Sequence, residues 1–427
     1  MRNNIQCHIL FCIVLVEMTV NVSAQTWTSQ TLPNTQTMRS VYFINSDEGW
    51  AAGYNGIIHT TNGGLLWSSQ ISNCPERLGS IKFVDANYGW ASGGHRILRT
   101  ENGGESWNEL SGIDINAGIF RNTIFPVSST VAWATAQFGA GPRWFYRYTA
   151  TSATTVTEQT YGLTGSYVRL INLWFVDQNN GWAVGDLGHI WRITNASSEA
   201  PNFTDQRNIG VITSTLWGVF FLDLNNGWAV GDGGTIIKTI NGGTNWSILT
   251  SGTTVNLKDV HFIDINNGCV VGEGGVILVT SNGGANWSPQ TSGVTTTLWS
   301  VMYVGSAPGF IAGGDFSTSG NGTILRTDNV LPVQSTSELP TAFTLNQNFP
   351  NPFNHSTEIS FYIPQNSMVS LKVYDVLGRQ VAALVDEQLQ TGNYTTTFDA
   401  SGLQNGIYFY RLQTTGFNQT RKLFLQK

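Results

Sequence analysis

Cationic and indole side chains recur at nearly one position of a repeated pattern in this sequence. These residues are Arg39, Arg121, Trp217, Lys258 and Trp299. Each precedes the central residue of its repeat by eleven positions, except Arg121, which precedes it by twelve. Cations beside aromatic faces suit an anionic partner, a sugar or a protein loop. The pattern predicts one binding site if the fold brings these side chains together; the alternative is that each packs separately on its neighbours.

Carboxylates also recur, at Asp186, Asp232 and Glu273. They stand between glycines, which favours a role in tight turns. Glycoside hydrolysis needs two positioned carboxyl groups or a tyrosine nucleophile with its base, and a sialidase also needs an arginine cluster. We identify no such set, and the six histidines show no metal-ligand spacing. We therefore expect no catalytic residue, metal or other cofactor, with a surface glycoside hydrolase as the alternative.

A repeat organises residues 25–330 and must position these side chains. Its centre is Gly-Trp-Ala or a looser copy, and the central positions are 50, 90, 133, 182, 228, 269 and 310. Steps of about forty residues, each with short apolar strands separated by Asn-Gly and Gly-Gly turns, are typical of propeller blades. The sequence predicts an all-β protein with a seven-bladed β-propeller, and the blade boundaries are least clear between residues 119 and 216.

Ring closure is also predicted from the repeat. Thr-x-Asn-Gly-Gly-x-x-Trp ends at Trp67, Trp107, Trp246 and Trp287, whereas the last unit stops at Asn329 without its tryptophan. Residues 25–30 resemble the segment around Trp287, so we expect the mature N-terminus to supply the fourth strand of the final blade. The first strand of each blade runs nearest the axis, and the cations and indoles should therefore gather at one mouth of the ring.

Composition and charge narrow the function classes. Charged residues form 11% of the 427-residue chain, and the formal net charge is −6. A nucleic-acid binder would carry a basic patch, which is absent from the sequence. Residues 1–24 read as a cleaved signal peptide with an apolar run ending at Val16 and small residues before Gln25. We expect no transmembrane segment in the mature chain.

The repeated motifs resemble Asp-box (BNR-type) propellers of the photosystem II stability and assembly factor family, with sialidases as more distant relatives. Thr-x-Asn-Gly-Gly-x-x-Trp and Gly-Trp-Ala-x-Gly carry this resemblance. It implies a propeller fold, an arginine-rich face in the photosystem factors, and a third functional alternative, an assembly factor.

The last part of the chain differs in composition. A polar linker at 331–346 leads to residues 347–427, whose alternating strands predict a small immunoglobulin-like β-sandwich. This segment resembles the C-terminal sorting domain of the type IX secretion system of Bacteroidetes. The matching residues are Asn351, Pro352, Tyr374, Asp375, Gly378, Gly406, Tyr408 and Lys422. The resemblance implies the secretion machinery as a partner; an ordinary immunoglobulin-like domain is the alternative.

Together these features predict an exported, non-enzymatic propeller that binds or scaffolds an unknown protein or glycan at the cell surface.

Overall fold

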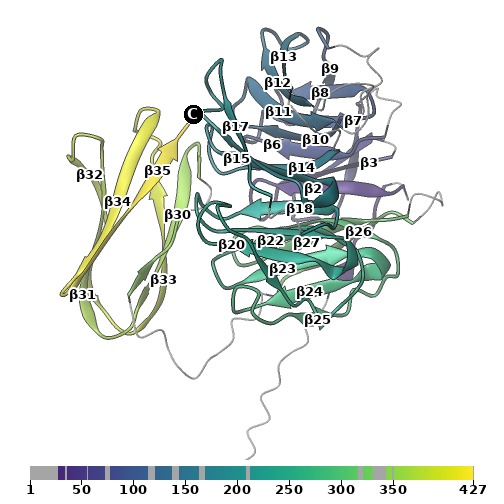
Figure 1. Ribbon diagram of the computed structural model, residues 1–427. Helices are drawn as coiled ribbons and strands as arrows, with labels where there is room; N and C mark the ends of the chain where they lie inside the picture. Colours follow the sequence, from purple (N-terminus) through teal and green to yellow (C-terminus); the bar gives the residue numbers. More distant parts are fainter. Residues whose placement is uncertain are drawn as a thin grey trace, which may run out of the picture.

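The computed structural model describes residues 27–33, 36–54, 56–72, 77–113, 121–136, 144–162, 169–207, 212–315, 321–329, 343–348 and 351–426. The predicted signal peptide and most of the predicted linker lie outside these residues. Apart from three short 3₁₀ turns, all of the regular structure within these residues is β-strand. Figure 1 shows two bodies, a ring of sheets and a separate sandwich formed by the C-terminal strands.

The ring is a β-propeller, and its described part contains seven four-stranded antiparallel sheets, which we name I to VII. Sheet I comprises β2 (Met38–Phe43), β3 (Gly49–Gly53), β4 (Gly56–Thr60) and β5 (Ser68–Gln70). Sheet II comprises β6 (Ser80–Phe83), β7 (Gly89–Gly93), β8 (Arg96–Thr100) and β9 (Asn108–Glu109). Sheet III comprises β10 (Arg121–Pro126), β11 (Val131–Ala136), β12 (Trp144–Ala150) and β13 (Val156–Gly162). Sheets IV and V comprise β14 (Leu170–Phe175), β15 (Gly181–Gly185), β16 (Ile190–Thr194) and β17 (Asn202–Asp205); and β18 (Leu216–Phe221), β19 (Gly227–Gly231), β20 (Ile236–Thr239) and β21 (Ser247–Leu249). Sheets VI and VII comprise β22 (Leu257–Phe262), β23 (Gly268–Gly272), β24 (Ile277–Thr280) and β25 (Ser288–Gln290); and β26 (Leu298–Tyr303), β27 (Gly309–Gly313), β28 (Thr323–Thr327) and β1 (Thr28–Ser29).

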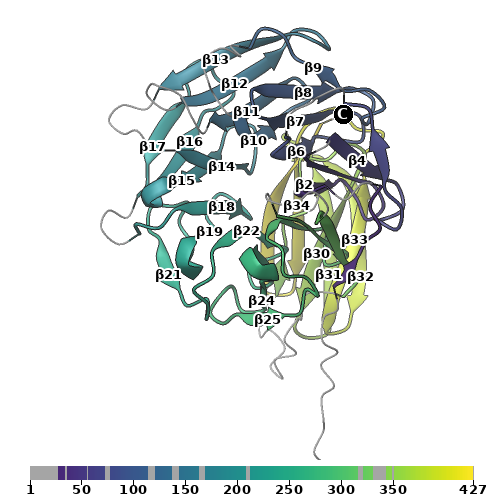
Figure 2. The same cartoon turned by 90° about the vertical axis from the view of Figure 1, so that its right-hand side faces the viewer.

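The first strands of the sheets form the inner wall of the ring. Each contacts the first strand of the next sheet, and β26 contacts β2, which closes the circle. Figure 2 shows β10, β14, β18 and β22 on the inside and β13 and β21 on the outside. Sheet VII includes the N-terminal strand, because Thr28 pairs with Arg326 and Ser29 with Leu325. This is the closure expected from the repeat.

Aromatic stacking between consecutive sheets explains the Gly-Trp pattern. The Trp228 indole of sheet V stacks on Phe262 of sheet VI with ring centroids 3.6 Å apart, and Trp50 and Trp182 stack on the next sheet in the same way. The preceding glycine is required because a Cβ at Gly227 would lie 2.5 Å from the Phe221 ring of its own sheet. The glycine thus leaves room for an aromatic ring of its own sheet, and the tryptophan stacks on an aromatic ring of the next sheet.

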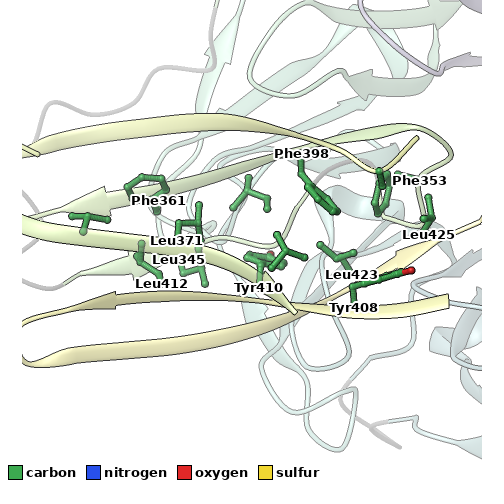
Figure 3. Packing of buried hydrophobic residues seen from close by; sticks show 14 of the residues in the cluster. Leu345, Phe353, Phe361, Leu371, Phe398, Tyr408, Tyr410, Leu412, Leu423 and Leu425 are labelled. Atoms are coloured by element: carbon green, nitrogen blue, oxygen red, sulfur yellow. The ribbon is translucent and has the colours of Figure 1, made fainter. Parts of the chain in front are cut away.

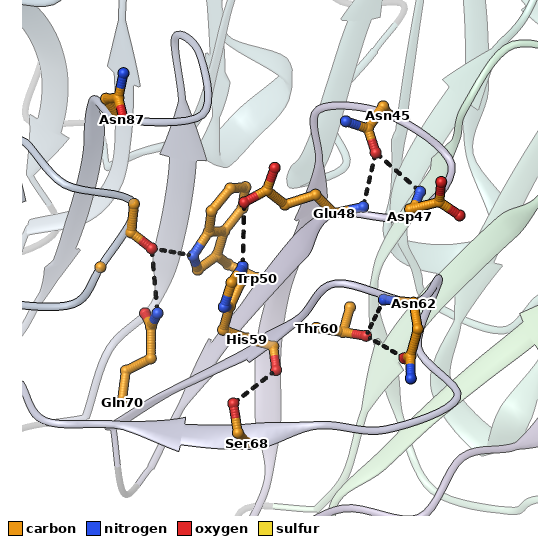
Figure 4. A network of polar contacts seen from close by, with 12 residues as sticks. Asn45, Asp47, Glu48, Trp50, His59, Thr60, Asn62, Ser68, Gln70 and Asn87 are labelled. Atoms are coloured by element: carbon orange, nitrogen blue, oxygen red, sulfur yellow. Dashed lines mark hydrogen bonds and ion pairs between the residues drawn. The ribbon is translucent and has the colours of Figure 1, made fainter.

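Polar side chains stabilise the turns that follow the third strands. In sheet I, the Thr60 hydroxyl accepts a hydrogen bond from Gly64 N at 2.9 Å, and Asn62 Oδ1 accepts one from Leu66 N at 2.9 Å. Trp50 Nε1 donates to Gly103 O of the next sheet at 2.9 Å (Figure 4). The threonine and asparagine of the motif therefore satisfy backbone groups, while the indole joins adjacent sheets.

The C-terminal sandwich packs a sheet of β29 (Thr344–Leu345), β30 (Ser356–Ile363) and β33 (Gly392–Asp399) on a sheet of β32 (Gln380–Leu389), β31 (Ser367–Tyr374), β34 (Gly406–Thr414) and β35 (Phe417–Leu425). Its core includes Phe361, Phe398 and Tyr410 (Figure 3). The sandwich begins earlier than residue 347, because Leu345 is buried in this core and pairs with Phe361. The predicted linker therefore extends too far.

A pair of glycines in one turn allows a stability test. Gly233 and Gly234 both have positive φ, at 66° and 73°, but a Cβ at Gly234 would lie 1.9 Å from Thr253 O, whereas a Cβ at Gly233 meets nothing within 4 Å. We expect Gly233→Ala to lower the free energy of unfolding by about 1–2 kcal/mol through backbone strain alone. Gly234→Ala should cost about 1–3 kcal/mol more, because the backbone must move. Urea unfolding of both variants measures the difference, and equal losses would contradict the close approach.

Candidate functional site

In most first strands, the residue at the predicted position of the repeat lies in a β-bulge. The ladder between the first and second strands skips one residue in sheets I, IV, V, VI and VII. The skipped residues are Arg39, Ile171, Trp217, Lys258 and Trp299. A bulge leaves its extra residue unpaired and redirects the side chain. The repeat thus places these residues in equivalent positions around one edge of the ring.

Arg121 does not occupy this position. In sheet III, Arg121 pairs with Ala136 and Thr123 with Thr135, so Asn122 is the skipped residue. Arg121 has the register of Met38 in sheet I, which is buried. The prediction that Arg121 is equivalent to Arg39 is wrong, because the spacing to the repeat centre is eleven residues in sheet III as well. The side chains of Arg121 and Asn122 lie outside the described part of the structure.

Four of the predicted side chains contact one another through cation–π interactions. The Arg39 guanidinium lies 3.9 Å from the centroid of the Trp299 ring. Lys258 Nζ lies 4.0 Å from the Trp217 ring and 5.5 Å from the Trp299 ring. Arg169, which the sequence reasoning missed, lies 5.2 Å from Trp217. We call Arg39, Arg169, Trp217, Lys258 and Trp299 the rim cluster; it extends over sheets I, VII, VI, V and the start of IV.

The recurring carboxylates bind the rim cluster as well as forming turns. Asp186, Asp232 and Glu273 begin the turns η1 (Asp186–Gly188), η2 (Asp232–Gly234) and η3 (Glu273–Gly275). Arg169 pairs with Asp186 at 2.9 Å and Lys258 with Glu273 at 2.8 Å. Trp217 Nε1 donates to Asp232 at 2.6 Å. Their interpretation as turn residues is therefore incomplete. In sheets V and VI, the spacing of fifteen residues between each acid and its partner could have indicated the pairing.

Burial and ion pairing act on the charged groups of the rim cluster. Lys258 is 5% exposed, so its ammonium depends on Glu273 for compensation. Partial burial raises the pKa of Glu273, but hydrogen bonds from Lys258 and Asn256 outweigh this effect and leave that pKa lowered. Burial lowers the pKa of Arg39 to about 10, which leaves its guanidinium charged at neutral pH. The cluster thus presents fixed cations and indole rings at one edge of the ring.

A second cation–aromatic pair continues this edge into sheet II. The Arg77 guanidinium lies 4.1 Å from the Tyr54 ring, and its Nη1 donates to the Tyr54 hydroxyl at 2.8 Å. Arg77 is exposed. This pair adds an accessible cation beside the rim cluster.

The sorting-domain motif residues act mainly within the sandwich. Asn351 Oδ1 accepts a hydrogen bond from Phe424 N at 2.8 Å, which ties the start of the domain to β35. Asp375 accepts from Leu377 N and Arg379 N at 2.9 Å each and thereby holds the turn at Gly378, whose φ is 76°. The Tyr408 hydroxyl donates to Gln404 O. These side chains maintain the shape of the domain.

The remaining motif residues have simpler positions. Tyr374 lies under the Arg411 guanidinium at 5.2 Å, and Lys422 Nζ lies 4.3 Å from the Phe424 ring. Pro352 follows Asn351, and Gly406 begins β34. Val376 and Leu377 at the neighbouring turn are 65% and 74% exposed, so this turn presents apolar surface to solvent.

Within the described ranges, no group of three His, Cys, Asp or Glu side chains is arranged to hold a metal ion. No helix in the described part of the chain has the length and hydropathy of a membrane span.

Comparisons with known proteins match a segment in each part of the chain. Residues 347–426 match the family described as secretion system C-terminal sorting domain. Residues 19–117 match the photosynthesis system II assembly factor YCF48. Among curated proteins, none matches this chain.

Solved structures agree on the propeller fold. The chain is 22% identical to a structure titled "YCF48 bound to D1 peptide", with a TM-score of 0.57 over 71% of this chain and 97% of that one. YCF48 from Cyanidioschyzon merolae is 17% identical, with a TM-score of 0.57 over 71% and 98% of the two chains. The WD40 propeller domain of Doa1 is 12% identical, with a TM-score of 0.54 over 74% and 98%. The chain therefore consists of a β-propeller similar in fold to the photosystem II assembly factor YCF48, followed by a segment that matches the secretion system C-terminal sorting domain.

Proposed function

We propose that this protein is a non-enzymatic binding protein of the cell surface and that its rim cluster holds an acidic segment of a partner protein. The sorting domain indicates secretion or an outer-surface location and implies an interaction with the secretion machinery. The propeller is then the cargo, and its binding surface faces the exterior.

The alternation of cations and indoles in the rim cluster carries this proposal. Arg39, Trp299, Lys258, Trp217 and Arg169 form a continuous series of contacts between five sheets. Arginine binds carboxylates with two parallel hydrogen bonds, and indole rings bury apolar surface at interfaces. An extended peptide with glutamate or aspartate side chains meets both requirements. The structure titled "YCF48 bound to D1 peptide" supports a peptide as the class of partner.

The carboxylates near the rim favour binding over hydrolysis. Asp186, Asp232 and Glu273 each engage a cation or an indole of the rim cluster. A glycosidase acid or base must remain available to the scissile bond. Their engagement supports a structural role, and a glycan remains the alternative ligand to be separated by experiment.

Peptide binding by the mature chain, residues 25–427, tests the proposal. Synthetic decapeptides containing no glutamate, two glutamates or four glutamates serve as probes in fluorescence anisotropy, with sialyllactose as the glycan probe. We expect affinity to rise with glutamate content and to fall about tenfold in Arg39→Ala, which loses a charge-assisted contact, and in Lys258→Ala, which loses the cation between the Trp217 and Trp299 rings. We expect no release of sialic acid.

Lys372→Ala is the matched control, since it removes an equal charge from an ion pair with Asp386 in the sandwich. Its affinity should equal that of the unaltered protein. Equal binding of all peptides, or unchanged affinity in Arg39→Ala and Lys258→Ala with native melting temperatures, would overturn the proposal. Cleavage of sialyllactose would favour the glycosidase instead.

A further inference from the structure

A second layer of side chains lies farther along the inner wall, eight residues before the central position of each repeat. Its members are Tyr42, Lys82, Phe125, Trp174, Phe220, His261 and Met302. Side chains from consecutive sheets contact one another there: Phe125 and Trp174 have ring centroids 5.3 Å apart, and Trp174 and Phe220 4.7 Å apart. Because the first strands form the inner wall, this layer surrounds the axis of the propeller.

Lys82 places an ammonium group inside this aromatic layer. Its Nζ lies 5.2 Å from the Tyr42 ring of sheet I and 5.3 Å from the Trp174 ring of sheet IV, so it extends across the axis. Within the described residues, no hydrogen-bond acceptor or ion-pair partner contacts this ammonium. A lysine has three N–H donors, and none of those of Lys82 is used by a described protein group. The group is therefore prepared for an acceptor that enters from outside.

His261 supplies a second polar atom without a partner at the same level. The residue is 9% exposed, and its ring lies 4.7 Å from Phe220. Its Nδ1 is buried without a hydrogen-bond partner among the described residues. Burial, together with the charge of Lys82, lowers the pKa of His261 to about 3, so the imidazole is neutral and acts only through hydrogen bonding.

The nearby carboxylate of Asp259 is not a hydrogen-bond partner of the Lys82 ammonium. Its Oδ1 accepts a hydrogen bond from Val260 N and its Oδ2 accepts one from Val301 N, both at 3.0 Å. Asp259 thus joins sheets VI and VII and only attracts Lys82 electrostatically; burial lowers the pKa of Lys82, and this attraction opposes the effect.

The axis at this level retains accessible surface. Tyr42, Lys82 and Trp174 are only half-buried, although they lie inside the ring and not on its outer face. Their surface faces the axis, since the first strands separate them from the exterior. Arg39, Trp217, Lys258 and Trp299 of the rim cluster stand three residues earlier on β2, β18, β22 and β26 and therefore flank the entrance.

We propose that this axial layer binds a small carboxylate with a flat apolar body. The carboxylate accepts hydrogen bonds from the Lys82 ammonium, and the apolar body lies against Tyr42, Trp174 and Phe220. Aromatic walls favour such a body because they bury its surface and offer stacking contacts. This site is independent of the partner segment proposed for the rim cluster, which uses other side chains.

Benzoate is the probe for this site, with benzyl alcohol as its neutral analogue and inorganic phosphate as an anion without an apolar body. Isothermal titration calorimetry of the mature chain should show saturable binding of benzoate in the micromolar to millimolar range and at least tenfold weaker binding of the other two. Lys82→Met should weaken benzoate binding at least tenfold, and Lys82→Arg should retain it.

Lys238→Met is the matched control for removing a partly enclosed lysine. Lys238 lies 5.0 Å from the Trp228 ring, but its ammonium already donates to Gly283 O at 3.0 Å. This variant should bind benzoate like the unaltered protein. Absence of saturable benzoate binding, equal binding of benzyl alcohol, or full binding by a folded Lys82→Met variant would each overturn the axial site. Loss of peptide binding in the rim variants would leave benzoate binding intact, which separates the two proposals.

Discussion

A mature chain that lacks residues 25–30 is expected to lose about 4 kcal/mol or more of its free energy of unfolding. Trp27 is 7% exposed and meets Tyr303 edge to face, with ring centroids 6.1 Å apart. Loss of a buried tryptophan typically costs 3–5 kcal/mol. The deletion also removes the ladder between β1 and β28 and the hydrogen bond from Gln30 N to Ile324 O.

Urea unfolding of the truncated and full mature chains measures this loss. The double variant Thr28→Ala, Gln30→Ala is the control, because it removes the side-chain hydrogen bonds of these two residues but keeps Trp27 and the backbone ladder. Its loss should stay below about 1 kcal/mol. The truncated chain should also self-associate, since β28 becomes an unpaired edge. A truncated monomer with unchanged stability would show that sheet VII does not need β1.

Between pH 7 and pH 4, the free energy of unfolding of the unaltered protein is expected to fall by about 3 kcal/mol more than that of His261→Gln. The pKa of His261 is about 3 in the folded protein, mainly through burial, against 6.5 when unfolded. A histidine with a lowered folded pKa contributes its full stability above pH 6.5 and loses it as the pH falls, because the unfolded state binds the proton first. Each unit of pH in this window is worth about 1.4 kcal/mol.

Chemical unfolding at several pH values tests this prediction as a difference between two proteins. Burial raises the pKa of Asp259 to about 6, and this group acts with the opposite sign, but it is present in both proteins and largely cancels. His95→Gln serves as a control for substitution of a histidine elsewhere in the propeller. If the free energy of unfolding changes with pH in the same way in the unaltered protein and in His261→Gln, the burial of a neutral imidazole at the axis is contradicted.

The repeat made most of the propeller predictable from the sequence. In the Gly-Trp-Ala motifs of sheets I, IV and V, the glycine lies beneath an aromatic ring of its own sheet and the indole stacks on an aromatic ring of the next sheet. The number of residues between successive motifs therefore gives the length of chain that forms one sheet. The missing tryptophan after Asn329 indicated where Trp27 belongs, because that position must be filled for sheet VII to be complete. The family matches and the propeller neighbours agree with this interpretation.

The rim cluster was only partly predictable. Counting eleven residues back from the repeat centre identified Arg39, Trp217, Lys258 and Trp299, but Arg121 lies twelve back, and the bulge of sheet III falls at Asn122 instead. Arg169 lies two residues before the counted position and reaches Trp217 from the neighbouring sheet. Such contacts depend on the packing between sheets, which the alternation within one strand does not encode.

The carboxylates and the sorting motif illustrate the same limit. Glycine neighbours correctly indicated a turn at Glu273, but the direction of its carboxylate toward Lys258 is set by the sheet geometry. The motif at Asp375 is recognisable as a pattern, and the structure assigns its side chain to the turn before Arg379. The sequence patterns therefore identified these residues but not the contacts that their side chains make.

The strand that closes sheet VII gives this protein a distinct order of folding. The other six sheets of the ring are each built from consecutive strands, whereas Thr28 and Arg326 meet across 298 residues. Contacts between such distant residues form slowly, because the ends of a long loop must meet first. During synthesis and export the chain therefore passes through an open arc of sheets. The edge of β28 stays exposed until the N-terminal strand arrives, and it is the point at which premature association would begin.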